Sequence, residues 1–321
     1  MANSTITLTA FARDTLEGLS SKNKYLLPKY FYDDAGSKIF SKIMKMPEYY
    51  LTDCEIELFE KQKEEITENL INGNKRLDII EPGSGDGLKT EYILKSLHRR
   101  DIDFSFIPVD ISSHANNILA DKMRKSIPGI SIEPLTGDYF SVMNKLERSS
   151  NTSRVILFLG SSIGNFSDTE LDSFLRGLNE ISTPGDRALI GFDLMKSPEI
   201  ILPAYNDPYG LTREFNINHL RRINRELGAD FNPGYFEHRQ EYNTDTGEMK
   251  SYLVSRTDHK VTFREPPAEI SFLKGESIFM ELSRKFSILT INEMASSHGF
   301  RVMNNFTDSR NYFVDSLWIR E

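Results

Sequence analysis

The sequence contains little cysteine, fewer basic than acidic residues, and no long apolar run. Its one cysteine, Cys54, cannot form an intrachain disulfide, which suits a reducing cytoplasm. The 39 lysine and arginine residues are outnumbered by 47 aspartate and glutamate residues, which gives a formal net charge of −8. A nucleic-acid surface needs clustered lysine and arginine, and basic pairs such as Arg99-Arg100 are isolated here. We therefore predict no nucleic-acid partner.

No apolar stretch approaches the ~20 residues that span a bilayer, and the first residues lack the basic start and apolar stretch of a secretion signal. The 6 histidines show no metal-site spacing, and one cysteine cannot supply a zinc cluster. These absences predict a soluble, cytoplasmic protein that uses neither a membrane nor a metal. The 321 residues allow two domains, or one large domain with insertions.

Short apolar strands alternate with helical periodicity through the middle of the chain. Such alternation indicates βαβ units and a parallel sheet, and near-continuous apolar strands fit a sheet that is covered on both faces. The predicted strands are Leu77–Ile80, Phe104–Val109, Ile130–Leu135, Val155–Leu159 and Ala188–Phe192, with Arg301–Phe306 and Tyr312–Ile319 near the C-terminus.

Between these two groups of strands the alternation stops. A polar helix is predicted over Leu211–Leu227, followed by an antiparallel pair, Tyr235–Tyr242 and Glu248–Arg256. The pattern predicts a sheet domain formed by 60–195 and 285–321, and a second domain formed by 1–59 and 196–284. Capping-box patterns predict three helix starts. They pair Thr52 with Glu55, Ser167 with Glu170, and Thr290 with Glu293.

A glycine-rich turn follows the first predicted strand, with the sequence Glu81-Pro82-Gly83-Ser84-Gly85. Glycines let the backbone turn sharply and approach a bound nucleotide. Asp110 ends the next strand, where a carboxylate can accept hydrogen bonds from both ribose hydroxyls. Alone, the turn is as consistent with a simple strand–helix connection. The preceding strand, the following helix and the downstream acid together favour a nucleotide site.

The turn departs from the dinucleotide pattern in two ways. Leu88 stands where a third glycine is expected, and Glu81 would repel a pyrophosphate. A carboxylate at that place suits the cationic methionine part of S-adenosylmethionine (SAM), and the turn resembles motif I of class I methyltransferases. Asp110 matches the ribose-binding acid of that class, and Asp138-Tyr139 resembles its adenine-contacting segment. An NAD-dependent oxidoreductase is the alternative of a different class, and a catalytically silent binding module is a third.

Several segments outside the turn are more distinctive. In order from about residue 25 to the C-terminus, they resemble the L-histidine Nα-methyltransferase family of ergothioneine biosynthesis. The resemblance implies a Rossmann-like class I methyltransferase sheet with helices on both faces, and a second α+β substrate-binding domain. It further implies a monomer that uses SAM to trimethylate the α-amino group of L-histidine, giving hercynine, the first step of that pathway. The matching segments are Leu27–Asp33, Met46–Leu51, Phe158–Phe166, Asn224–Leu227 and Met280–Phe286.

The resemblance also implies roles for individual residues. Tyr49 would lie where cofactor and substrate meet, and Tyr32 would lie near the methylated nitrogen, which makes these two the candidate catalytic residues. The residues expected to contact the cofactor are Tyr49, Glu81, Gly83, Gly85, Lys89, Asp110, Asp138, Tyr139 and Gly160.

On the substrate side, Asn165 and Tyr205 match residues that hold the amino and carboxylate end, and Glu281 and Ser283 match the pair that binds the imidazole. Both imidazole nitrogens need a partner, which a glutamate and a hydroxyl supply. Such a pair disfavours an indole, because its polar groups would then lack partners. Ser251, however, replaces a methionine of the family, so methylation of tryptophan or another aromatic amino acid remains the nearest alternative.

Overall fold

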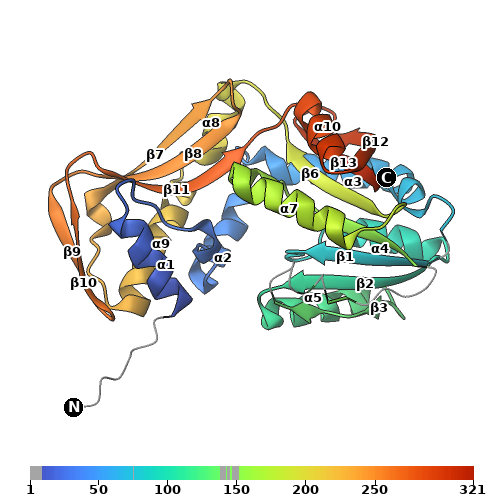
Figure 1. Ribbon diagram of the computed structural model, residues 1–321, viewed down its shortest axis with the longest axis horizontal. Coiled ribbons are helices and arrows are strands. Elements are labelled where there is room, and N and C mark those ends of the chain that lie inside the picture. Colours follow the sequence, from blue (N-terminus) through green and yellow to red (C-terminus); the bar gives the residue numbers. More distant parts are fainter. Residues whose placement is uncertain (1–8, 75, 138–141, 143–144, 147–151) are drawn as a thin grey trace, which may run out of the picture. The chain divides into compact units, whose positions relative to one another are not determined.

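The computed structural model describes residues 9–74, 76–137, 142, 145–146 and 152–321. The chain divides into two compact units, each built from separate stretches of sequence (Figure 1). We call Leu51–Met195 with Arg284–Glu321 the sheet unit, and Met1–Tyr50 with Lys196–Ser283 the hairpin unit. Among the described residues, no helix is both long enough and apolar enough to cross a membrane.

The sheet unit contains one mostly parallel sheet. Its strands lie in the order β12-β13-β6-β5-β1-β2-β3, with β4 also pairing with β2. From β1 the chain proceeds to β2 on one side and later to β5 and β6 on the other, so the strand order reverses between β1 and β5. Open α/β sheets bind ligands at such a reversal, outside the carboxyl ends of the strands. The strands are β1 (Arg76–Pro82), β2 (Asp103–Asp110), β3 (Ser131–Ile132), β4 (Leu135–Thr136), β5 (Ser153–Phe158), β6 (Arg187–Asp193), β12 (Phe300–Thr307) and β13 (Phe313–Arg320).

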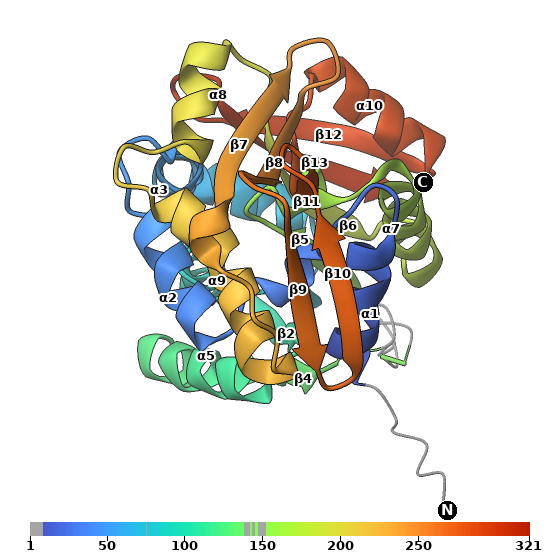
Figure 2. The same cartoon turned by 90° about the vertical axis from the view of Figure 1, so that its left-hand side faces the viewer.

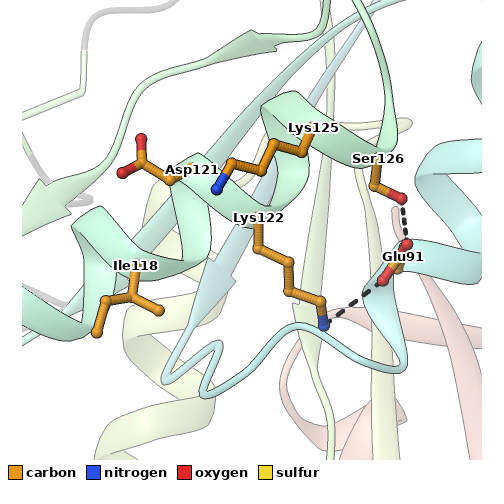
Figure 3. Close-up of a pocket in the computed structure, with 6 residues that line it drawn as sticks. All are labelled: Glu91, Ile118, Asp121, Lys122, Lys125 and Ser126. Carbon is orange, nitrogen blue, oxygen red and sulfur yellow. Dashed lines mark hydrogen bonds and ion pairs between the residues drawn. The ribbon is translucent and has the colours of Figure 1, made fainter.

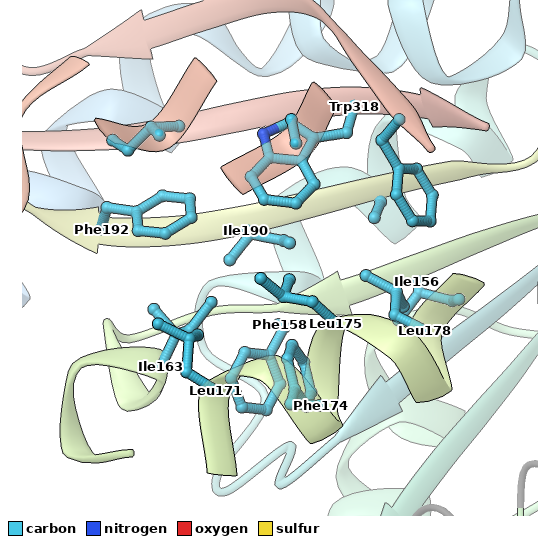
Figure 4. Packing of buried hydrophobic residues seen from close by; sticks show 14 of the residues in the cluster. Ile156, Phe158, Ile163, Leu171, Phe174, Leu175, Leu178, Ile190, Phe192 and Trp318 are labelled. Carbon is cyan, nitrogen blue, oxygen red and sulfur yellow. The ribbon is translucent and has the colours of Figure 1, made fainter. Parts of the chain in front are cut away.

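Helices cover both faces of this sheet because alternate strand residues point to opposite sides. Ile79 belongs to the core beneath α3 (Tyr50–Ile71), α4 (Thr90–Arg99) and α5 (Ser113–Ser126). The next residue, Ile80, belongs to the core beneath α7 (Asp168–Ile181) and α10 (Ile288–Ser297). In Figure 4, side chains of α7 such as Phe174 and Leu178 pack against Ile156 and Ile190 of the sheet, with Trp318 nearby.

Most of the predicted elements of the sheet unit are confirmed, with strand ends that differ by one or two residues. The predicted strand Ile130–Leu135 is instead two short strands, β3 and β4, because Pro134 between them cannot donate a ladder hydrogen bond. The capping box of Ser167 and Glu170 is formed. The other two predicted helix starts are wrong.

Helix α3 begins at Tyr50, so Thr52 and Glu55 lie inside it. Helix α10 is capped by Ser287, whose hydroxyl accepts from the backbone N–H of Thr290.

The hairpin unit combines short sheets with helices. Strands β7 and β8 confirm the predicted antiparallel pair and continue to β11 in a sheet of order β11-β8-β7. Strands β9 and β10, which the sequence analysis did not predict, form a separate antiparallel pair (Figure 2). The elements are α1 (Ala10–Ser20), η1 (Pro28–Tyr30), α2 (Asp34–Ile43), α8 (Pro198–Tyr205), α9 (Leu211–Leu227), η3 (Pro233–Tyr235), β7 (Phe236–Asn243), β8 (Glu248–Ser255), β9 (His259–Arg264), β10 (Pro267–Phe272) and β11 (Ser277–Arg284).

Candidate active site

The glycine turn of the sheet unit lies between the carboxyl end of β1 and the start of α4. Gly83 and Gly85 both have positive φ, 68° and 55°, and a Cβ atom built at either would meet nothing within 4 Å. The Gly83 N–H donates to the carbonyl of Val109 at 2.8 Å, which holds the turn beside the end of β2. The turn therefore presents open backbone next to Asp110.

Asp110 is the last residue of β2, and one of its carboxylate oxygens accepts the backbone N–H of Ser112 at 2.8 Å. A carboxylate has about four acceptor sites, so this bond leaves capacity for further donors. Because Pro82 and Val109 are paired across β1 and β2, Asp110 is a neighbour of the glycine turn. This is the arrangement that the sequence predicted for a ribose-binding acid.

Glu81 is buried at the end of β1, with 4% of its surface exposed. The Thr90 hydroxyl donates to its Oε1 at 2.5 Å, while Oε2 has no hydrogen-bond partner in the part of the chain that the structure describes. Burial raises the pKa of Glu81 to about 8, although Thr90 and the charge of Lys89 act in the opposite direction. A buried acid of this kind regains its charge when a cation is placed beside it.

Lys89 and Gly160 lie on opposite sides of the strand-order reversal, after β1 and after β5 respectively. Both contact Glu55 of α3. The Lys89 ammonium donates to Glu55 Oε2 at 2.5 Å, and the Gly160 N–H donates to Glu55 Oε1 at 2.8 Å. A Cβ atom at Gly160 would lie 3.1 Å from Lys89 Nζ, so a glycine there lets the ammonium approach. Glu55, which was predicted to form part of a helix cap, thus joins these two predicted cofactor residues.

Asn165 ends a short 3-10 helix, η2 (Ser162–Asn165), that follows β5. The residues beside Asn165 pack closely against the rest of the sheet unit. The Ser161 hydroxyl accepts the N–H of Asp193 at 2.8 Å, and a Cβ atom at Gly164 would lie only 2.6 Å from the carbonyl oxygen of Arg284. Asn165 therefore ends a closely packed turn in the same unit as the glycine turn.

In the hairpin unit, three predicted substrate residues lie close to Tyr32, which was predicted as a catalytic residue. The hydroxyls of Tyr205 and Ser283 are hydrogen-bonded at 2.7 Å. Alternation along β11 places Glu281 on the same face as Ser283, as predicted from their period-two spacing. Burial, and then the negative charge of Glu281, raise the pKa of Tyr32, so Tyr32 lies within electrostatic reach of Glu281.

Tyr49 is connected to this group through aromatic packing. The ring of Phe40 lies 5.4 Å from that of Tyr32 and 6.2 Å from that of Tyr49, both edge to face. The adjacent Tyr50 hydroxyl accepts from Lys196 Nζ at 3.0 Å. Lys196 was not among the site residues predicted from the sequence.

The predicted adenine-contacting residues, Asp138 and Tyr139, lie outside the described residues. A surface hollow of about 640 Å³ lies on α4 and α5 of the sheet unit (Figure 3), and no predicted site residue lines it. Its lining side chains are charged or exposed, and Lys122 in it donates to the carbonyl of Asp86 at 2.8 Å. The described cofactor residues of the prediction lie instead at the carboxyl ends of β1, β2 and β5 of the sheet unit. Tyr205, Glu281 and Ser283 lie on α8 and β11 of the hairpin unit.

Comparison with known proteins agrees with this geometry. The family described as histidine-specific, SAM-dependent methyltransferases matches residues 11–320. The histidine N-alpha-methyltransferase of Mycolicibacterium smegmatis is 33% identical over 311 residues, which cover 97% of this chain and 95% of that protein. The enzyme of the same name from Mycobacterium tuberculosis is 32% identical over 96% of this chain and 94% of its own length. Ergothioneine biosynthesis protein 1 of Schizosaccharomyces pombe is 27% identical over 92% of this chain, but the match covers only 39% of that longer protein.

The fold and these matches define a class I SAM-dependent methyltransferase. The chain belongs to the histidine-specific, SAM-dependent methyltransferase family. The described residues fit the cofactor, because the open glycine turn allows close approach and the unpartnered Oε2 of Glu81 is suited to a cation. Glu81, Lys89 and Asp110 are the side chains that we expect to hold it.

The pKa of Glu81 makes SAM binding pH-dependent in a defined direction. In the free protein it is about 8, and a cationic ligand favours the ionised carboxylate, so protonation competes with binding below that pH. We expect SAM affinity to increase by up to about tenfold per pH unit from about pH 6 towards 8, and then to level off. Calorimetric titration across this range measures the effect.

The variant Glu81→Gln is the control, because ionisation of the ligand itself affects both proteins equally. The difference between the two pH curves therefore isolates Glu81. Parallel curves for the wild type and the variant would show that Glu81 does not titrate on binding.

Proposed function

We propose that this enzyme transfers methyl groups from SAM to the α-amino nitrogen of L-histidine three times in succession, giving hercynine for ergothioneine biosynthesis. The observation that best supports histidine as the acceptor is the hydrogen bond between Tyr205 and Ser283, beside the face of β11 that carries Glu281. In this proposal the sheet unit binds the cofactor and contributes Asn165 to substrate recognition, and the hairpin unit supplies the other groups that recognise the amino acid.

The polar groups on β11 match an imidazole in number and kind. Glu281 can accept a ring N–H, and the Ser283 hydroxyl can donate to or accept from the second nitrogen. The hydrogen bond between the Tyr205 and Ser283 hydroxyls places both groups beside the face of β11 that carries Glu281. We assign Tyr205 to the substrate carboxylate. Asn165, on its closely packed turn, is assigned to the amino and carboxylate end.

The chemistry needs correct positioning more than a strong base. Bound SAM supplies an electrophilic methyl group on a sulfonium. The neutral α-amine attacks the methyl carbon in line, and the new nitrogen–carbon bond forms as the carbon–sulfur bond breaks. A proton then leaves the nitrogen for solvent before the next transfer, and the third transfer leaves a quaternary ammonium with no N–H.

The environment of the reacting nitrogen is aromatic. Because its pKa is raised, Tyr32 stays a neutral phenol near neutral pH and does not act as an ionised base. Its ring and that of Tyr49 are suitable neighbours for an ammonium that gains methyl groups, since aromatic rings attract cations that cannot donate hydrogen bonds. We assign both tyrosines to positioning this nitrogen.

Incubation of the enzyme with SAM and each of the common amino acids in turn tests the proposal, with the mass of each amino acid followed over time. Histidine alone should gain one, two and then three methyl groups. Methylation of tryptophan or another aromatic amino acid in place of histidine would show that Glu281 and Ser283 have been misassigned to an imidazole. If no amino acid gains a methyl group, the substrate assignment is wrong.

We further propose a cytoplasmic enzyme that acts as a monomer on free histidine. Light scattering of the purified protein measures the molar mass in solution. The expected value is that of one chain of 36.9 kDa, and a stable dimer mass would contradict this part of the proposal.

A further inference from the structure

A buried group of charged residues lies beneath Lys89, one of the side chains expected to hold the cofactor. Its centre is Glu55 of α3, which is 1% exposed. One oxygen of its carboxylate accepts from Lys89 Nζ and the other from the Gly160 N–H, at 2.5 and 2.8 Å. A single side chain thus joins the segment after β1 to the segment after β5, on the two sides of the strand-order reversal.

A second acid lies against Glu55. Asp315 on β13 is fully buried and is paired with Gly191 on β6. A Cβ atom at Gly191 would lie 2.9 Å from Glu55 Oε1 and 3.1 Å from Asp315 Oδ1, so both carboxyl groups reach the same place. Neither oxygen of Asp315 accepts a hydrogen bond from any N–H or O–H of the described residues.

Charge balance identifies which acid carries a proton. Two ionised carboxylates beside one lysine would leave a net negative charge in the protein interior, which is costly. Burial, and then the charge of Glu55, raise the pKa of Asp315 well above its usual value. Burial acts to lower the pKa of Lys89, but the charge and hydrogen bond of Glu55 outweigh it and leave that pKa raised. The charge balance therefore favours a neutral Asp315 beside the ion pair of Glu55 and Lys89.

We propose that Glu55 is a positioning residue of the cofactor site, which fixes the Lys89 ammonium and the Gly160 backbone, and that Asp315 serves as its neutral hydrogen-bond donor. Lys89 has three N–H donors, of which Glu55 engages one, and 25% of its side chain remains exposed. Held in this way, the ammonium is presented to the carboxylate of the methionine part of SAM. The inference depends on the cofactor and not on which amino acid is methylated.

Substitutions at the two acids test the proposal through the dissociation constant of SAM, measured by calorimetry without any amino acid. Glu55→Gln removes the charge and places an amide N–H against Lys89 or Gly160. Loss of one charge-assisted hydrogen bond should raise the dissociation constant of SAM by at least about tenfold. Asp315→Asn keeps a donor towards Glu55, so its dissociation constant should stay within about threefold of the wild type.

Controls separate positioning from general stability. Glu65→Gln changes an exposed acid on the same helix and should leave SAM binding unchanged. For Glu55→Gln, the KM for the methyl acceptor at saturating SAM should change far less than the dissociation constant of SAM. If Glu55→Gln does not fold, Glu55→Asp can replace it, because aspartate keeps the charge on a side chain that is one methylene shorter. This variant is expected to raise the dissociation constant of SAM severalfold.

Two results would overturn the proposal. A folded Glu55→Gln protein with unchanged SAM affinity, even one of lower melting temperature, would make the role of Glu55 purely structural. An Asp315→Asn protein that loses affinity as strongly as Glu55→Gln would show that Asp315 does not act as a neutral donor. Failure of histidine methylation affects neither measurement, so the two proposals can fail separately.

Discussion

Replacing Glu281 with alanine is expected to lower kcat/KM for histidine by about 10–10²-fold, while the dissociation constant of SAM stays within about twofold. The change leaves an imidazole N–H without its charged acceptor in a site otherwise built for it, and a hydrogen bond to a charged group contributes about 1.5–3 kcal/mol. Steady-state rates at varied histidine, with SAM saturating, measure the effect.

A matched control is available in the same unit. Glu269 on β10 is exposed and forms an ion pair with Lys260 at 2.6 Å, and surface pairs of this kind contribute little. Glu269→Ala should therefore leave histidine kinetics unchanged. Loss of activity in Glu281→Ala caused by weaker SAM binding, with the KM for histidine unaffected, would contradict the assignment of Glu281 to the imidazole.

Replacing Asp110 with alanine is expected to weaken SAM binding by at least about 10²-fold. The Asp110 carboxylate is assigned to both ribose hydroxyls, and two hydrogen bonds to a charged acceptor together correspond to roughly 3–6 kcal/mol. Its bond from the Ser112 N–H is also lost, but that bond joins a partly exposed turn and contributes little to global stability. Calorimetry with SAM measures the dissociation constant directly.

The control for this variant lies on the same strand. Asp103 begins β2 as Asp110 ends it, and the Asp103 side chain is exposed, 3.7 Å from Arg76. Asp103→Ala should bind SAM like the wild type. If Asp103→Ala and Asp110→Ala lower affinity equally, the effect arises from the strand as a whole and not from contact with the ribose.

Local sequence patterns were sufficient to predict the sheet. The strands around Ile79 and Leu189 are apolar and short, and helical stretches separate them, so hydrophobic periodicity alone located them. The glycine turn and Asp110 were predictable for a similar reason, since their roles depend on backbone geometry at strand ends. The pair Glu281 and Ser283 followed from period-two spacing combined with the family resemblance.

Features that depend on contacts between distant residues were not predictable. The pairing of Tyr205 with Ser283 joins residues 78 positions apart, and no local pattern signals it. Glu55 was interpreted as a helix cap, because a glutamate three residues after a threonine fits that pattern. Its place among Leu51, Cys54 and Leu58, at helical spacing, was the signal that the side chain is buried.

Asp315 carried a similar signal, as the one acid in the mostly apolar strand Phe313–Arg320. A charged residue in such a strand must find a partner inside the protein. Which partner it finds depends on the strand order. Strand β13 pairs with β6 in the antiparallel sense, and this pairing places Asp315 beside Gly191. The proximity of Asp315 to Glu55 therefore became visible only once the fold was known.

Locating the transferred methyl groups on the product tests the central claim most directly. The enzyme is incubated with L-histidine and SAM carrying a ¹³C-labelled methyl group, and the product is examined by NMR. The account predicts that the reaction ends with three equivalent methyl groups on the α-nitrogen and an unmodified imidazole ring. A methyl group on either ring nitrogen, or none on histidine at all, would contradict it.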